Sequence, residues 1–421
     1  MKKKISLIFL YFILSIQLLF SQEVFKAMFY NVLNYPLQQP TSRIQDLEII
    51  INDYLPDLFM ICELNNVQGA NDIFNVLTSI NPDYTRAQFV LNTSDNNIGN
   101  QNDLQNMLYY DSSKFILQSQ HEVTTIYRDF NHYILKLNTV NQDSNPIILN
   151  VFITHLKSSS GVDNQALRLE MVNNFITYLD NNVANDSYVI LGGDLNLYTS
   201  SEPAFQELTD PSNNITFTDP ANRVGSWHNN SSYLDVFTQS TRTQTDLGGA
   251  TGGFDDRFDF ILTSENMHTN TDIFYVNNSY QVYGNNNNPL CWNSEINTSD
   301  CSGTLFSEAI RESLYYMSDH LPVILELQTN EPLLSQFNNF IILPIEFING
   351  NTIKNQLKLK VNKTKNNITE LYIFNSLGQK LNSIILGNSS LLNINTSHLT
   401  SGLYYIKTNN MSIKPLKFIK H

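Results

Sequence analysis

Strand-like apolar runs recur along the first three quarters of the chain. Runs of β-branched, aliphatic and aromatic residues bounded by turn-forming residues predict β-strands. Several of these runs are apolar throughout, so both of their faces should be covered, by helices or by a second sheet. The pattern predicts an α/β domain with extensive sheet. The runs are VLTSI, QNMLYYD, YILKL, PIILNVFITHL, SYVILGGDL, FDFILTS and LPVILEL.

Helical periodicity is clearest in residues 164–179. Its apolar side chains recur at the spacing that places them on one helix face, and they are Leu167, Met171, Val172, Phe175, Ile176 and Leu179. A weaker pattern in residues 41–55 predicts a second helix, with Ile44, Leu47, Ile51 and Leu55 in phase.

Six segments each join a strand-like run to a polar side chain. The segments are FYNVLNY, LFMICELNN, NVFITHLKS, YVILGGDLNLY, DDRFDFILTS and MSDHLPVILEL. A buried strand of this kind delivers one functional group to an edge shared with its neighbours. The polar residues are Asn31, Glu63, His155, Asp194, Asn196, Asp259, Asp319 and His320.

The chain divides into four parts. Residues 1–21 have the lysines, apolar run and small residue of a signal peptide cut between Ser21 and Gln22, with a membrane anchor as the alternative. Residues 23–328 carry all six segments and form one domain, with irregular stretches at 197–257 and 277–312. Residues 329–340 are a linker. Residues 341–421 contain short alternating strands that predict a small β-sandwich.

The composition restricts the partners and the compartment. The formal net charge of -14 over 421 residues argues against a broad basic surface for a polyanion. If the substrate is a nucleic acid, attraction must be local. In an exported protein Cys291 and Cys301 can form a disulfide, although two unpaired thiols remain the alternative. Cys62 is expected to be a buried thiol.

The polar residues suit metal-assisted attack on a phosphodiester. A divalent metal neutralises the anionic oxygens and lowers the pKa of the attacking water. Mg²⁺ prefers oxygen ligands, and Glu63 with Asp319 suits one ion. Asp194 and Asn196 can face one phosphate. His155 and His320 are candidates for proton transfer, with Asp259 orienting one imidazole.

Each of these residues also has an ordinary structural interpretation. Asp194 and Asn196 can form a turn, Asn31 and Asp319 can cap turns, and His155 can be a hydrogen-bonded core residue. Glu63 can simply begin a loop. Together, however, they would need several independent explanations.

The six segments resemble the endonuclease/exonuclease/phosphatase superfamily over about residues 24–328. The resemblance implies a four-layer α/β sandwich, with two central β-sheets flanked by helices. It implies that Asn31 supports the metal carboxylate, that Glu63 and Asp319 bind metal, and that Asp194 with Asn196 positions water and phosphate. His155, Asp259 and His320 are further implied catalytic groups. After Glu63 the chain lacks the arginine of pancreatic-type deoxyribonucleases, and the carboxylate that pairs with His155 in those enzymes has no counterpart that we can place.

The tail is similar to the C-terminal sorting domains of the Por-type secretion pathway. The residues that carry this resemblance are LYIFNSLGQKL, SGLYYIKT and the closing KPLKFIK. The opening motif is degraded to IILPIEFING, so the start of the domain is not fixed. The resemblance implies a secreted or cell-surface protein that contacts the secretion machinery.

These features favour an exported, metal-dependent nuclease that acts on DNA or RNA. We expect Mg²⁺ or Mn²⁺ as cofactor, with Ca²⁺ as a further candidate, and a monomer with no stable membrane span. We assign Asn31, Asn196 and Arg242 to substrate binding, and Asn31 with Glu63 and Asp319 to the metal. The alternatives are a sphingomyelinase-like lipid phosphodiesterase and a non-catalytic surface-binding protein.

Overall fold

The computed structural model describes residues 23–94, 104–269 and 271–335, and, in the C-terminal part, 345–348, 350–361, 368–387, 390–410, 413 and 415–421. The expected signal peptide lies outside these residues. Two compact units divide the chain, one ending at Leu334 and one beginning at Ser335. Among the described residues, no helix combines the length and the apolar character needed to span a membrane.

The first unit is built on two sheets. The 7-stranded sheet has the order β11-β13-β1-β2-β4-β3, with β12 also paired to β13, and β1 and β2 run parallel. Its strands are β1 Glu23–Tyr35, β2 Leu58–Leu64, β3 Tyr84–Arg86, β4 Gln105–Asp111, β11 Ile273–Tyr275, β12 Gln281–Val282 and β13 Val323–Thr329.

The second, 6-stranded sheet has the order β5-β6-β7-β8-β10-β9, with β7 and β8 parallel. Its strands are β5 Phe115–Val123, β6 Phe130–Leu137, β7 Ile148–His155, β8 Tyr188–Asp194, β9 Phe217–Thr218 and β10 Asp259–Ser264. The sheets approach closely at Gly192, where an added Cβ would lie 2.9 Å from the Met60 sulfur of the other sheet.

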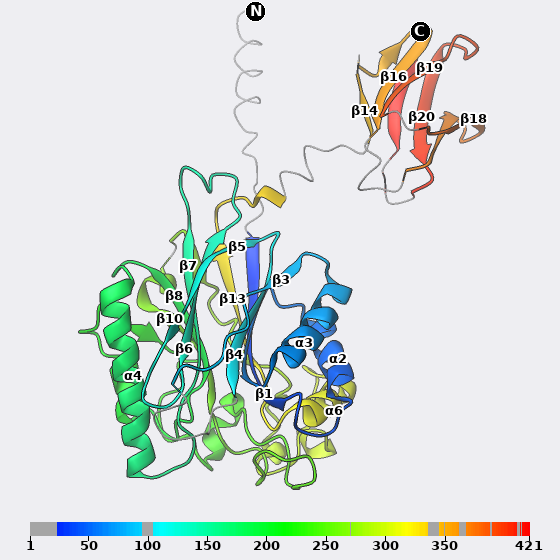
Figure 1. Cartoon of the computed structure of the whole chain (residues 1–421). Helices are drawn as coiled ribbons and strands as arrows, with labels where there is room; N and C mark the ends of the chain where they lie inside the picture. Colours follow the sequence, from blue (N-terminus) through cyan, green and yellow to red (C-terminus); the bar gives the residue numbers. More distant parts are fainter. Residues whose placement is uncertain are drawn as a thin grey trace, which may run out of the picture. The chain divides into compact units, whose positions relative to one another are not determined.

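Helices cover the outer face of each sheet, as Figure 1 shows. Helices α2 (Arg43–Tyr54), α3 (Val67–Ile80) and α6 (Glu308–Met317) lie on the β1 side, and α4 (Val162–Asn182) lies along β6, β7 and β8. Alternate residues of β7 show why both faces are buried. Val151 and Ile153 join the core between the sheets, and Phe152 joins the core under α4. The predicted four-layer α/β sandwich is confirmed.

Two segments differ from the sequence prediction. VLTSI is the end of helix α3 and not a strand, because Ala70, Ile73 and Leu77 share a buried face and the Asn66 side chain caps the first turn. The stretch 277–312, expected to be irregular, contains β12 and the first turn of α6. The remaining short elements are α5 Pro203–Leu208, η2 Ser231–Val236, η3 Glu265–His268, η4 Pro289–Cys291 and η5 Ser299–Cys301.

The C-terminal unit is a β-sandwich, as predicted. A 3-stranded sheet (β14-β16-β19) and a 5-stranded sheet (β15-β21-β20-β17-β18) share one apolar core. In β16, Leu357, Leu359 and Val361 are buried and alternate with exposed residues. The strands are β14 Ile345–Phe347, β15 Thr352–Ile353, β16 Gln356–Val361, β17 Glu370–Asn375, β18 Lys380–Ile385, β19 Leu391–Asn395, β20 Gly402–Thr408 and β21 Leu416–Lys420.

The expected linker begins later than residue 329. Thr329 ends β13, and Leu333 is buried and pairs with Thr139. Residues up to Leu334 therefore belong to the first unit.

Candidate active site

Strand register brings four of the predicted side chains to one end of the two sheets. Asn31 in β1 lies beside Cys62, the neighbour of Glu63 in the parallel strand β2. In the other sheet, His155 of β7 pairs with Asp194 of β8. Parallel neighbouring strands end at the same edge of a sheet, so the residues at these strand ends lie close together although they are far apart in the sequence.

Asn31 joins the two sheets. Its amide nitrogen donates to Glu63 Oε1 at 3.0 Å and to Asp194 Oδ2 at 3.0 Å. Its oxygen accepts from the Leu33 backbone N–H at 2.9 Å, which fixes the orientation of the amide. The group turned toward the carboxylates is the amide nitrogen, which positions Glu63 and Asp194. The metal contact of Asn31 stays a prediction.

Glu63 has an uncommon backbone conformation. Its φ of 59° lies in the left-handed region, which costs a non-glycine residue roughly 1–2 kcal/mol. The pairing of β2 with β4 shifts register between Ile61 and Leu64, around this residue. Glu63 Oε2 accepts from the Asn34 backbone N–H at 3.0 Å. Such a maintained outlier is typical of functional positions.

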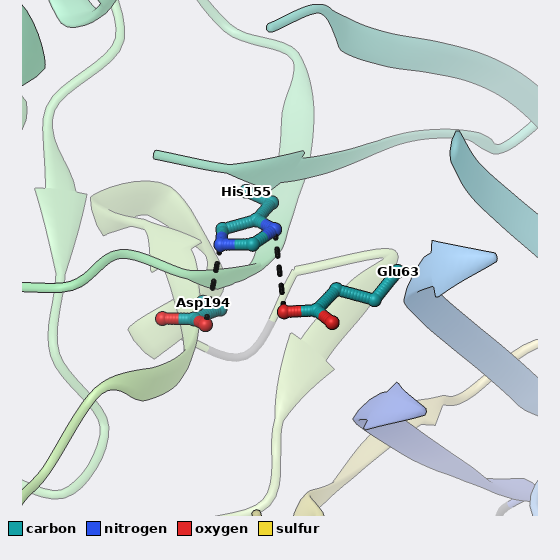
Figure 2. A group of neighbouring side chains, drawn as sticks. All are labelled: Glu63, His155 and Asp194. Atoms are coloured by element: carbon teal, nitrogen blue, oxygen red, sulfur yellow. Dashed lines mark ion pairs between the residues drawn. The ribbon is translucent and has the colours of Figure 1, made fainter. Parts of the chain in front are cut away.

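His155 lies between two carboxylates (Figure 2). Its Nε2 is 3.6 Å from Asp194 Oδ2, and its Nδ1 is 3.8 Å from Glu63 Oε1. Nδ1 is buried and has no hydrogen-bond partner among the described residues. Burial, with a smaller contribution from nearby Arg128, holds the pKa of His155 well below its usual value. This imidazole is therefore neutral in the metal-free protein.

His320 has the opposite electrostatic setting. Its Nδ1 lies 2.6 Å from Asp259 Oδ2, and its Nε2 lies 3.7 Å from Asp194 Oδ2. Burial alone would lower the pKa of His320, but Asp259, Asp319 and Asp194 raise it well above its usual value. The sequence predicted that Asp259 orients one imidazole, and the structure shows that this imidazole is His320, whose Nδ1 keeps its proton beside the carboxylate.

Asp319 is held by the glycine-rich loop. Its Oδ2 accepts from the Ala250 backbone N–H at 2.6 Å and from Gln239 Nε2 at 3.1 Å. An added Cβ on Gly249 would lie 2.6 Å from the Asp319 Cγ, so the loop could not approach the carboxylate with another residue there. Asp319 Oδ1 is buried without a hydrogen bond among the described residues.

Asn196 completes the turn after β8. Its backbone N–H donates to Asp194 Oδ1 at 3.2 Å, and its amide donates to the Leu156 carbonyl at 3.3 Å. Its φ of 52° is one that asparagine adopts readily. The GDLN segment thus forms a turn, and it also presents Asp194 to both histidines.

The donor set fits a divalent cation. The ligand atoms of Glu63, His155 and Asp194 lie within 4.8 Å of one another, as do those of Asp194, Asp259 and His320. Burial, together with neighbouring carboxylates, raises the pKa of Glu63 and of Asp194. A bound cation would relieve this accumulation of buried negative charge. Asp319, whose charge acts on Glu63, has one carboxylate oxygen without a hydrogen bond among the described residues.

Arg242 is removed from the expected substrate contacts. Its side chain is fully buried, and the guanidinium donates to the carbonyls of Tyr315, Tyr316, Leu247 and Gly248. It therefore fixes the loop that carries Ala250.

Two residues near the site have no signal in a single sequence. Arg128 donates to the His155 and Leu156 carbonyls, and its Nε is buried without a partner among the described residues. The charge interactions of this guanidinium include Glu63 and Asp194. Gln239 contacts Asp319 and also His320. Both come from irregular segments, where no periodicity marks them.

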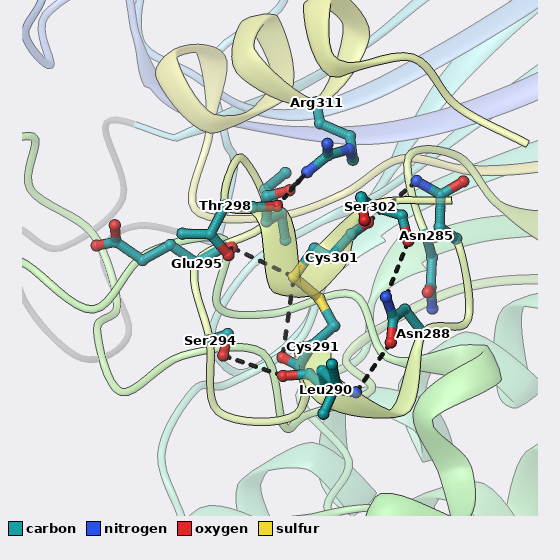
Figure 3. The surroundings of a disulfide bond; sticks show 12 residues. Asn285, Asn288, Leu290, Cys291, Ser294, Glu295, Thr298, Cys301, Ser302 and Arg311 are labelled. Atoms are coloured by element: carbon teal, nitrogen blue, oxygen red, sulfur yellow. Dashed lines mark hydrogen bonds between the residues drawn. A yellow bond between two sulfur atoms is a disulfide. The ribbon is translucent and has the colours of Figure 1, made fainter. Parts of the chain in front are cut away.

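The disulfide lies beside the same loop. Cys291 is bonded to Cys301, and the buried Cys62 is free, as predicted. Figure 3 shows the side chains around the bond, where Arg311 donates to the Thr298 carbonyl. Phe254 donates to the Ser294 carbonyl, which links the disulfide segment to the end of the glycine-rich loop.

Comparison with known proteins identifies the tail. Residues 351–420 match the family model of the secretion system C-terminal sorting domain. No curated protein matches the chain.

Several solved structures are similar to this chain at low sequence identity. An endonuclease/exonuclease/phosphatase family protein from Bacteroides thetaiotaomicron is 12% identical, covers 73% of this chain and 99% of its own, and has a TM-score of 0.45. The human Nocturnin catalytic domain is 14% identical, covers 74% of this chain and 98% of its own, and has a TM-score of 0.44. A mannosyl-6-phosphatase from Bacteroides thetaiotaomicron is 12% identical, covers 72% of this chain and 99% of its own, and has a TM-score of 0.43. The resemblance of the tail predicted from the sequence is confirmed by its family model.

Proposed function

We propose that the first unit is a metal-dependent hydrolase of phosphodiester bonds, and that its substrate is a nucleic acid. The observation that carries the proposal is the convergence of Glu63, His155, Asp194 and the Asp259–His320 pair at one buried edge to which both sheets contribute. Binding alone would not require carboxylates and two differently charged imidazoles within such short distances.

In this proposal, metal binding and proton transfer are assigned to different residues of the site. Glu63, Asp194 and Asp319 would hold the cation, with His155 as a further candidate ligand. When bound, the cation supplies charge neutralisation and lowers the pKa of a water. His320, with its Nδ1 proton shared with Asp259, can stabilise negative charge or move a proton at Nε2. In this proposal the Asn196 amide and the Arg128 guanidinium contact phosphate oxygens.

The test compares substrates under identical conditions. Purified protein is incubated with plasmid DNA, RNA and sphingomyelin, with and without Mg²⁺. We expect metal-dependent cleavage of a nucleic acid, with a shallow salt dependence because the acidic protein neutralises few phosphates. Cleavage of none of these phosphodiesters would overturn the proposal.

A lipid phosphodiesterase is the second candidate, and one observation favours it. Leu290 and Trp292, at the edge of the disulfide segment, are 68% and 40% exposed. Apolar side chains in water at such a position suit contact with a membrane. Faster cleavage of sphingomyelin than of either nucleic acid would favour the lipid phosphodiesterase over the nuclease.

The tail match supports export. We propose that residues 335–421 address the enzyme to the cell surface or medium through the secretion machinery. A chain ending at Leu334 should keep its activity and remain inside the native host, and cell fractionation checks this. Normal export of the shortened chain would contradict the role.

A further inference from the structure

The segment 238–241 joins the strand that carries Asp259 to the loop that carries Asp319 and His320. On one side Asp256 donates its backbone N–H to the Gln239 carbonyl at 2.8 Å. On the other side Thr241 donates to the Asp319 carbonyl at 3.0 Å, and Leu321 donates to the Thr238 carbonyl at 2.7 Å. Gln239 pairs with Asp256 and with His320 in the manner of a short antiparallel strand. Its backbone position is therefore fixed from both sides.

The Gln239 side chain contacts two functional groups at once. Its Nε2 lies 3.1 Å from Asp319 Oδ2 and 2.6 Å from His320 Nε2. An amide nitrogen carries two hydrogens, so it can donate to Asp319 Oδ2 and, when the His320 ring is neutral with its proton on Nδ1, to His320 Nε2 as well. Because His320 Nδ1 is bound to Asp259, this amide reaches the other ring nitrogen and prevents the imidazole from rotating.

The same contact orients the Asp319 carboxylate. Gln239 and Ala250 both donate to Oδ2, which leaves Oδ1 as the oxygen without a hydrogen bond among the described residues. Two donors on one oxygen fix the carboxylate plane and present the other oxygen to the site. Partners of this kind commonly change metal affinity 10–100-fold when they are removed.

We propose that Gln239 is a positioning residue that aligns Asp319 for the cation and His320 for the phosphate through its side-chain amide. The proposal rests on the metal-dependent function proposed above. It assigns to Gln239 no contact with the substrate or the cation, so its effects should pass through Asp319 and His320.

Gln239→Met is the test variant, because methionine has a similar length and shape but no N–H. Gln239→Asn is the second variant, since it keeps the amide but withdraws it by one methylene. Gln244→Met is the matched control. Gln244 lies in the same irregular region and donates its amide to Tyr315 Oη at 2.9 Å, away from the site residues.

The first measurement is Mn²⁺ binding to metal-free protein, by calorimetry or by loss of the free-ion electron paramagnetic resonance signal. We expect both Gln239 variants to bind Mn²⁺ about 10-fold more weakly or worse, and the control to bind like wild type. This measurement requires no substrate.

The second measurement is turnover of bis(p-nitrophenyl) phosphate at saturating Mn²⁺. A positioning role predicts that kcat falls about 10-fold or more while KM changes little, because the groups used in the transition state are misaligned. Wild-type Mn²⁺ affinity and wild-type kcat in both variants would overturn the proposal. If wild type binds Mn²⁺ but cleaves no phosphodiester, the proposed function fails, and the binding measurement still decides on Gln239. A thermal scan identifies an unfolded variant, in which case the smaller change, Gln239→Asn, decides.

Discussion

The His155 end and the His320 end of the site differ although both imidazoles are buried at the same sheet edge. His155 sits at the end of a regular strand, and its Nδ1 lacks a hydrogen bond among the described residues. His320 lies in a loop, and both of its nitrogens have polar neighbours. Burial decides the charge of His155, and carboxylates decide the charge of His320. Position in the fold therefore does not determine protonation, because the local partners do.

Metal removal should have the largest effect, because both ends of the site need the cation for activity. EDTA should stop phosphodiester cleavage, and Mg²⁺ or Mn²⁺ should restore it, because the ligands are hard oxygens. Glu63→Gln should lower kcat roughly 10³-fold, equivalent to about 4 kcal/mol of transition-state stabilisation. Glu48→Gln, an exposed position on α2, is the control. Full activity in EDTA would rule out the metal site.

Histidine substitutions should show which end contributes more to the reaction. His320→Ala and His155→Ala should each lower kcat about 10²-fold or more. We expect the larger loss for His320, because its charge is stabilised by Asp259. The double variant should lose less than the product of the single losses, as members of one unit do. Substitution of the exposed His121 is the control. Wild-type rates in His320→Ala would remove it from the mechanism.

The pH dependence of stability should have opposite signs at the two ends. The stability that accompanies the raised pKa of His320 is fully present below the unfolded pKa of about 6.5 and is lost as pH rises through the folded pKa. The stability that accompanies the lowered pKa of His155 is present above about 6.5 and is lost as pH falls toward the folded pKa.

Thermal scans in EDTA test these signs. The Tm difference between wild type and His320→Gln should be larger near pH 6 than near pH 9. The difference for His155→Gln should be larger near pH 8 than near pH 5. We expect changes of at least about 2 °C, since about 1 kcal/mol moves Tm by about 2–4 °C for a domain of this size. Equal slopes for both variants would show that the two histidines do not differ in charge.

Loss of the disulfide should lower the stability of the domain, and within the site it should change only the His320 end, to a small extent. Replacing Cys291 and Cys301 by serine should lower the free energy of unfolding by about 3 kcal/mol, which urea titration measures. Mn²⁺ affinity should fall slightly, through the loop that holds Asp319. Alkylation without reductant, followed by mass spectrometry, should label neither cysteine of the pair. Labelling of Cys291 in native protein would contradict the bond.

The sequence predicted the layers and most of the site because strand periodicity and strand ends are local signals. It failed at α3, where Val76, Thr78 and Ile80 imitate a strand while the buried face is set by Ala70, Ile73 and Leu77. It also misplaced Arg242, since a single arginine in a loop does not show whether its partners are phosphates or carbonyls. Gln239 was missed because its role depends on contacts about 80 residues away.

The amide of Asn31 makes activity a sensitive reporter of how the two sheets are seated on each other. The Asn31 side chain crosses the interface between the sheets, because Glu63 belongs to one sheet and Asp194 to the other. Gly192→Ala, whose added Cβ would lie 2.9 Å from the Met60 sulfur, should cost about 1–3 kcal/mol of folding free energy, which a stable domain can lose if the sheets slide by a fraction of an ångström to relieve the contact. The same slide would separate Glu63 from Asp194. Selection for catalysis should therefore remove interior substitutions that selection for stability would tolerate, and the packed centre of this protein should vary less than its thermal stability alone requires.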